Sequence, residues 1–357
     1  MTSNSREALS VVSALFHAIH NARRMDGRIT TSMSPQGIGS AMLGLQGMAS
    51  SSEEVRNMLG LISWSLRNTE KPLDAQAMAN VLLGMKSMSD DDACACELLQ
   101  ALVDHLEFHP QVLASASGRE ISMALWGLQG MSERLPAVSR LLDMITDVLQ
   151  KGTGRFTRDS ELGSALGGLR RMSGSPAVLR LVHAIGLELV KGHSHSHNHS
   201  DLHQHASLST GSQSRTGIIR FELEQNVANC FFGLQGLTCS AEKNGNNDGN
   251  DSSEPVRLLL VGLAQSLRLY RGTMSPRAVA SAVYGLQSMG PAPEVLEIVK
   301  LLTPFIVNDH FGGKISTCER GLAEERGYRG GRSTRSGSRA KGKFISKRER
   351  GRSGRGE

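Results

Sequence analysis

The chain contains one stretch whose residues could bind a metal ion. Between residues 191 and 216, histidine occupies every second position from His193 to His199. Imidazoles at this spacing can chelate Zn²⁺ or Ni²⁺, but a defined tetrahedral zinc site needs more ligands, and no cysteine or carboxylate cluster lies nearby. We therefore interpret the stretch as a polar insertion and expect no cofactor. The weak metal-ligand candidates are His193, His195, His197 and His199.

The end of the chain carries a second kind of chemistry, a concentration of arginine. Residues 320–357 hold 13 Lys/Arg and 4 Asp/Glu, whereas residues 1–319 hold 27 and 30, so the net positive charge of the chain comes from the tail. Arginine beside glycine, as at Arg326, Arg329 and Arg332, binds RNA through phosphate contacts and stacking on bases. A solubilising or localising tail is the alternative, and the sequence leaves both open.

Any other functional site would have to be built on the helices of the chain. A repeated motif of the type Gly-Leu-Gln-Gly-Met indicates where these helices lie. Its six copies begin at Gly44, Gly84, Gly127, Gly168, Gly233 and Gly285. The first four lie 40, 43 and 41 residues apart, and the two longer intervals contain the low-complexity segments 191–216 and 241–254. A fixed period near 40 residues indicates stacked helical hairpins.

Each repeat predicts two helices. We number positions from the leading glycine of the motif; positions −6, −2, +1 and +4 are apolar, which places them on the core face of a first helix. Glycine within a helix costs on the order of 1 kcal/mol relative to alanine, so we expect close backbone approach between neighbouring repeats there. A second helix follows a polar turn in every repeat. The expected second helices are 53–66, 95–108, 135–150, 176–190, 255–270 and 293–307.

These patterns predict an all-α fold, an α-solenoid (superhelix) of about six helix–turn–helix repeats. Residues 1–30 would form a capping helix from a partial repeat, with Ala8, Val11, Val12, Leu15, Phe16 and Ile19 on one face. The repeat array would span 31–311, interrupted by disordered inserts at 191–216 and 241–254, and a disordered tail would occupy 312–357. No apolar run approaches the roughly 20 residues that span a bilayer. We therefore expect no membrane insertion. We also expect the protein to be a monomer.

Polar residues recur eight and four residues before the motif glycine, one helical turn apart. The pairs are Gln36/Ser40, Gln76/Asn80, Arg119/Met123, Ser160/Ser164, Gln225/Asn229 and Arg277/Ser281, with Met123 the exception. Amides, hydroxyls and arginines that vary between repeats are the groups that one-base-per-repeat RNA readers use. The alternative is that they form only the solvated side of the first helix or cap it. The motif glutamines form a second polar line, for which we favour hydrogen bonds between adjacent repeats.

The repeats resemble a known class. The stretch 274–289 is similar to the first helix of octotricopeptide repeats and 293–299 to the second, and 121–126 follows the same pattern with its aromatic residue in place. The resemblance covers roughly residues 30–307. It implies an α-solenoid and RNA binding in organelles.

The leading hypothesis is a non-catalytic repeat protein that binds RNA, in a mitochondrion, a chloroplast or the cytoplasm. A protein-binding scaffold of the armadillo or tetratricopeptide type is the alternative. The net charge of −3 over residues 1–319 favours the scaffold, whereas the arginine tail and the resemblance favour RNA. No glycine-rich phosphate loop follows a strand, and no nucleophile lies beside a histidine and an acid at a telling spacing, so we expect no enzyme.

Overall fold

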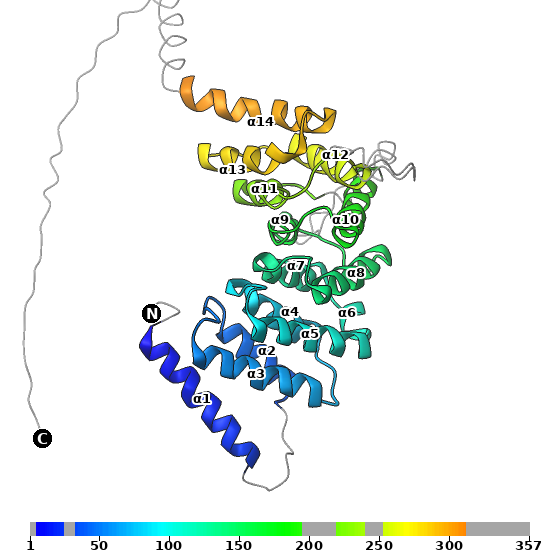
Figure 1. Ribbon diagram of the computed structural model, residues 1–357. Helices are drawn as coiled ribbons and strands as arrows, with labels where there is room; N and C mark the ends of the chain where they lie inside the picture. Colours follow the sequence, from blue (N-terminus) through cyan, green and yellow to red (C-terminus); the bar gives the residue numbers. More distant parts are fainter. Residues whose placement is uncertain (1–4, 25–32, 195–218, 240–252, 312–357) are drawn as a thin grey trace, which may run out of the picture. The chain divides into compact units, whose positions relative to one another are not determined.

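A computed structural model of the chain describes residues 5–24, 33–194, 219–239 and 253–311 (Figure 1). The chain divides into two units, Met1–His310 and Phe311–Glu357, and the description below concerns the first. Its described residues form helices and turns without a strand, which confirms the predicted all-α class. None of these helices is both long and apolar enough to cross a membrane.

The helices form two rows that alternate along the chain (Figure 1). The A row consists of the helices that end in the glycine motif: α2 (Pro35–Gly44), α4 (Ala75–Gly84), α7 (Gly118–Gly127), α9 (Asp159–Gly167), α11 (Glu224–Phe232) and α13 (Pro276–Leu286). The B row consists of α1 (Arg6–Arg24), α3 (Glu53–Asn68), α5 (Ala93–Phe108), α8 (Pro136–Gln150), α10 (Pro176–Ser194), α12 (Glu254–Arg268) and α14 (Pro293–Phe311).

The main contacts run between successive helices of the same row. Each A helix packs on the next A helix, and each B helix from α1 to α10 packs on the next B helix. Helix α12 is joined to α14 by ion pairs from Arg257 and Arg268. Because α1 packs on α3, it takes the place of a B helix before the first complete hairpin.

The apolar positions of the motif form the core. Side chains at −6, +1 and +4 are buried in every repeat except at Met48, which is partly buried. Position −2 is fully buried in five repeats, but Val283 is 39% exposed because no A helix packs beyond α13 in the described part of the chain. In α1 the prediction was partly wrong. Val11 and Leu15 are 59% and 52% exposed, since only the face with Val12 packs on α3.

The leading glycines lie where neighbouring A helices touch. A Cβ atom at any of the last five would come closer than 3.0 Å to the backbone carbonyl of the residue at position −2 in the preceding A helix. The pairs are Gly84 with Met42, Gly127 with Leu82, Gly168 with Leu125, Gly233 with Leu166, and Gly285 with Phe231. This confirms the expected close approach. Gly44 is the exception, because nothing lies within 4 Å of a Cβ placed there.

Local signals set most helix boundaries. Ser34 and Ser275 precede proline, and their hydroxyl oxygens accept hydrogen bonds from the backbone N–H groups of Gly37 (3.1 Å) and Ala278 (3.4 Å). Several boundary details differ from the prediction, and α14 ends at residue 311 and not at 307. The motif continues beyond the A helix as a 3₁₀ turn in η1 (Met85–Ser87), η2 (Leu128–Gly130) and η4 (Gln287–Met289). Helix α10 continues to residue 194, and a short helix, α6 (Gln111–Ala114), was not predicted.

Candidate nucleic-acid interface

Each A helix has one stripe of mostly exposed or half-buried residues, at positions −8, −4 and −1; Gly167 is buried. Residues four and seven apart share one side of an α-helix, so these three positions form a single line along the helix. The residue at −8 is exposed in all six repeats, and the residue at −4 is exposed or half-buried. We call this the A-row stripe. The predicted polar pairs therefore lie together on accessible surface, and none of them belongs to the core.

Two repeats carry the same amide pair in the A-row stripe. The Nε2 of Gln76 donates to Oδ1 of Asn80 at 3.0 Å, and the Nε2 of Gln225 donates to Oδ1 of Asn229 at 2.8 Å. Each bond leaves the glutamine oxygen and the asparagine NH₂ group able to bind a further partner. The two amides thus present a fixed acceptor and donor, the combination that recognises a base edge.

The remaining predicted residues of the stripe carry amide, hydroxyl and guanidinium groups. Gln36, Ser40, Ser160 and Arg119 are exposed, as is Arg277, while Ser164 and Ser281 are half-buried. Within the described residues, Arg119 and Arg277 form no ion pair. Met123 is half-buried and contributes no polar group.

Five arginines of the B row form ion pairs among the described residues. Each of these pairs joins one B helix to the next B helix. The pairs are Arg67–Glu97 (2.7 Å), Arg140–Asp104 (3.0 Å), Arg140–Glu107 (3.1 Å), Arg180–Asp143 (2.5 Å), Arg257–Glu294 (2.9 Å) and Arg268–Glu297. Exposed pairs of this kind contribute about 0–1 kcal/mol each to stability. Their larger effect is on charge, because a paired guanidinium attracts a phosphate less strongly than a free one.

Sequence reasoning missed the third position of the A-row stripe. Position −1 holds Leu43, Leu83, Trp126, Gly167, Phe232 and Tyr284, which we call the stacking ridge. Leu43 and Tyr284 are exposed, and Leu83, Trp126 and Phe232 are half-buried. The spacing of seven residues from position −8 was the available signal, since it places apolar side chains beside the polar pairs.

The motif turns themselves tie neighbouring repeats together. The Nε2 of Gln235 donates to the backbone oxygen of Arg170 at 2.7 Å, and Arg171 Nη1 donates to the backbone oxygen of Gly130 at 2.9 Å. The hydroxyl of Ser288 donates to the backbone oxygens of Gln235 (2.8 Å) and Leu237 (2.9 Å). At Gln235 this confirms the structural role favoured for the motif glutamines.

Two acidic residues near the A-row stripe accept hydrogen bonds from backbone N–H groups where the next A helix begins. Asp159 is buried, and its Oδ2 accepts from the backbone N–H groups of Glu222 (2.8 Å) and Leu223 (3.3 Å) and from Nδ2 of Asn226 (2.9 Å). The Glu224 carboxylate in turn accepts from the backbone N–H of Ser275, at the start of α13. Their negative charge is therefore shared with donors of the next repeat.

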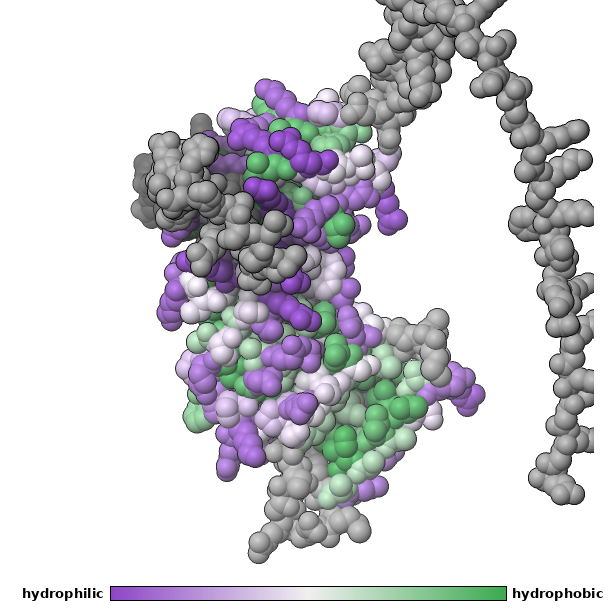
Figure 2. All heavy atoms as spheres, turned by 180° about the vertical axis from the view of Figure 1, so that it is seen from behind, coloured by the Kyte–Doolittle hydropathy of each residue, from purple (hydrophilic) through white to green (hydrophobic). Residues whose placement is uncertain are grey.

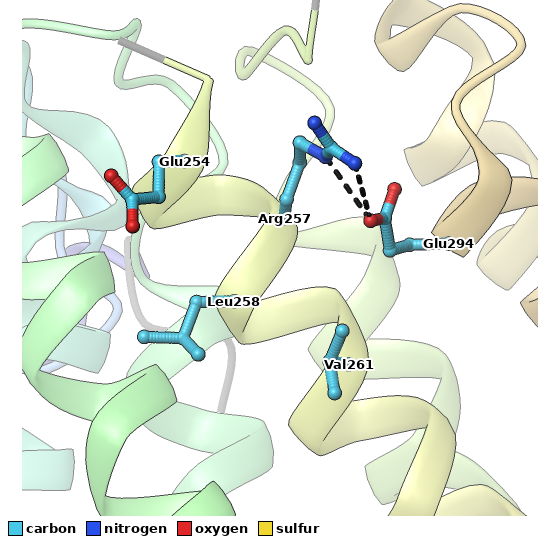
Figure 3. A pocket seen from close by; sticks show the side chains of 5 residues that line it. All are labelled: Glu254, Arg257, Leu258, Val261 and Glu294. Atoms are coloured by element: carbon cyan, nitrogen blue, oxygen red, sulfur yellow. Dashed lines mark hydrogen bonds and ion pairs between the residues drawn. The ribbon is translucent and has the colours of Figure 1, made fainter. Parts of the chain in front are cut away.

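A surface depression of about 370 Å³ lies on the opposite row, between α12 and α14 (Figure 3). Leu258 and Val261 line it together with Glu254, and at its edge both Nε and Nη2 of Arg257 donate to one oxygen of Glu294, at 3.1 and 2.9 Å. The other Glu294 oxygen is buried without a hydrogen-bond partner. The Arg257–Glu294 pair is one of two ion pairs that join these helices, and we assign no chemistry to the depression.

Several predicted residues fall outside the part that the structure describes. These are the side chains of the histidine candidates His193, His195, His197 and His199 and the tail arginines Arg326, Arg329 and Arg332. Among the described residues, no group of three or more His, Cys, Asp or Glu side chains is placed to hold a metal ion. Comparison of the chain with models of protein families, with curated proteins and with solved structures gives no match.

Proposed function

We propose that the chain is an α-solenoid of six helix–turn–helix repeats that binds single-stranded RNA along the A-row stripe. The observation that carries this proposal is the contrast between the two rows. Four arginines of the B row, from α3 to α12, are exposed or half-buried and paired with carboxylates of a neighbouring helix: Arg67, Arg140, Arg180 and Arg268. In contrast, Arg119 and Arg277 on the A row have no ion pair among the described residues. Amides at fixed spacing lie on the same stripe.

The resemblance to octotricopeptide repeats supports the same proposal and suggests an organellar target. Base selection would come from the amides and hydroxyls at −8 and −4, which differ between repeats. The arginine-rich tail would add affinity without sequence choice, because phosphate contacts carry no base information. In this proposal the protein is not an enzyme and acts as a monomer.

The experiment is a binding titration with a random single-stranded RNA pool at several salt concentrations. The double variant Arg119→Gln/Arg277→Gln should reduce the slope of log K against log salt by about 0.7 for each lost phosphate contact. Arg134→Gln is the matched control, since Arg134 is an exposed arginine in the turn before α8 and lies off the stripe. Its slope should equal that of the unaltered chain.

The same titration separates the tail from the helices. A chain that ends at residue 311 should bind more weakly but keep a preference for particular RNA sequences, recoverable by selection from the pool. If removal of residues 312–357 abolishes all RNA affinity and no preference remains, the RNA proposal is wrong and the scaffold alternative stands.

A protein scaffold is the second candidate, favoured by apolar side chains that no helix covers. Leu296, Val299 and Ile306 are exposed on α14, and Val11 and Leu15 are exposed on α1. Figure 2 shows such side chains gathered over the lower end of the helical unit, where α1 and its neighbours lie. Exposed apolar patches often mark protein interaction surfaces.

A further inference from the structure

The stacking ridge carries an aromatic ring in three of the six A helices, at Trp126, Phe232 and Tyr284, beside groups that can bind phosphate and base edges. At one end, the rings of Phe232 and Tyr284 come from consecutive A helices. Their centroids are 6.0 Å apart and their planes differ by 27°. Tyr284 is half exposed, so part of this stacked pair is open to solvent. Two repeats thus share one aromatic surface.

A second aromatic surface lies at the middle of the ridge. The Trp126 ring extends over Gly167, because a Cβ atom at Gly167 would lie 2.5 Å from Cζ3 of the indole. Gly167 is the residue at −1 of the next repeat, and because it has no side chain, the indole can lie against its backbone. Lys86 Nζ, from the preceding repeat, is 4.8 Å from the ring centroid. A cation and an aromatic face thus occur together.

We propose that unpaired nucleic-acid bases stack on the ridge at Trp126 and at the Phe232–Tyr284 pair. This inference rests on the RNA-binding function proposed above and specifies how the strand is held. Every base offers a π-face, so stacking on aromatic side chains is tolerant of sequence and needs a strand whose bases are unpaired. On α11, the amides of Gln225 and Asn229 lie within two helical turns of Phe232 and would contact the edges of bases stacked there.

Charge favours a nucleic acid over a peptide as the partner. Lys86, Arg119 and Arg277 are positively charged groups near the ridge that form no ion pair within the described residues. A strand that stacks its bases on the rings would bring its phosphates to these cations. A neutral apolar peptide would leave them without a partner.

The test uses the full chain with Trp64→Phe, which leaves Trp126 as the single tryptophan. The probes are a 12-nucleotide oligouridine and an abasic ribose-phosphate strand of the same length and charge. We expect oligouridine to quench the Trp126 fluorescence and the abasic strand to leave it unchanged, even where fluorescence anisotropy detects binding of both. Circular dichroism checks that Trp64→Phe keeps the helices folded.

Substitution on the exposed ring provides the second measurement. Tyr284→Ala should weaken oligouridine binding about tenfold, while Tyr284→Phe retains it, because the ring and not the hydroxyl makes the contact. Val299→Ala, at an exposed apolar residue of α14 off the ridge, should bind like the unaltered chain.

The outcomes are distinguishable. Binding by anisotropy without a change in Trp126 emission, together with full affinity of Tyr284→Ala, overturns stacking and leaves RNA binding intact. Absence of any oligonucleotide binding by the full chain overturns both proposals and favours a protein partner. Equal quenching by the abasic strand also overturns stacking, because that strand has no bases.

Discussion

At the scale of the residue, the repeated glycine is explained by contact and not by an unusual backbone angle. Gly84, Gly127, Gly168 and Gly233 all have right-handed helical dihedral angles that other residues adopt readily. What excludes a side chain is the carbonyl of the preceding A helix, which lies where Cβ would be. The motif is therefore a packing requirement that recurs once per repeat.

This packing requirement predicts that alanine has different effects on stability at the leading glycines of two copies of the motif. Gly127→Ala should lower the free energy of unfolding by about 3 kcal/mol, because the methyl group overlaps the Leu82 backbone, which cannot rotate away. Gly44→Ala is the matched control; its methyl group meets nothing within 4 Å, so better helix propensity should raise stability by up to about 1 kcal/mol. Urea unfolding followed by circular dichroism measures both, and equal effects would contradict the explanation.

A buried carboxyl group predicts a dependence of stability on pH. Glu188 Oε1 accepts from the backbone N–H of Phe156 at 3.0 Å, while Oε2 is buried without a hydrogen-bond partner. Burial raises the pKa of Glu188 to about 7 from an ordinary value of 4.5, although the Phe156 bond and nearby Arg155 act in the opposite direction. Because the folded-state pKa is raised, the stabilising contribution is complete below pH 4.5 and is lost as pH rises through 7.

Replacement of this carboxyl should remove that dependence. Glu188→Gln resembles the protonated side chain, so we expect a stability close to that of the unaltered chain near pH 4.5 and about 2 kcal/mol higher at pH 8. The measurement is urea unfolding at both pH values. A parallel loss of stability between pH 4.5 and 8 in both proteins would show that Glu188 is not the group responsible.

At the scale of the element, the helices were predictable and several of their contacts were not. The 3.6-residue apolar period and the Ser-Pro and glycine signals located both helices of each repeat, because these signals act within one turn of the chain. The exposure of Val11 depends on which side of the apolar face of α1 packs on α3, which no local pattern decides. The polar pairs were noticed because they recur one helical turn apart, whereas the ridge beside them was overlooked because most of its residues are apolar.

Contacts across the long segment between α10 and α11 were beyond any local signal. Asp159 accepts hydrogen bonds from residues 63 to 67 positions further along, at the start of α11. Asp159→Ala would leave two backbone donors and one amide without this acceptor in a buried site, at a cost of about 2–4 kcal/mol. Amide hydrogen exchange in α11 should rise with the loss of stability.

The neighbouring residue supplies the control for that element. Ser160 is exposed, so Ser160→Ala should change stability by less than about 0.5 kcal/mol and leave exchange in α11 unaltered. If Asp159→Ala is equally well tolerated, α11 begins where it does for reasons other than these hydrogen bonds.

At the scale of the whole molecule, the contacts link successive helices of a row, so disturbance of one interface should remain local. Gly285→Ala places a methyl group against the Phe231 carbonyl, at the last interface between A helices that the structure describes. Amide hydrogen exchange should rise in α11, α13 and α14 and stay unchanged in α4 and α5, because α4 and α5 share no interface with α13.

The same substitution at the central Gly127 should affect a different set of helices, and the comparison tests the repeat arrangement itself. Gly127→Ala disturbs the interface between α4 and α7, so exchange should rise on both sides of it and extend to α5 and α8. A chain with nearest-neighbour coupling must respond differently to the two substitutions, since its stability is a sum of interface contributions. If Gly285→Ala instead raises exchange evenly through every helix from α2 to α14, the helices unfold as one cooperative globule and the six-repeat solenoid is the wrong description.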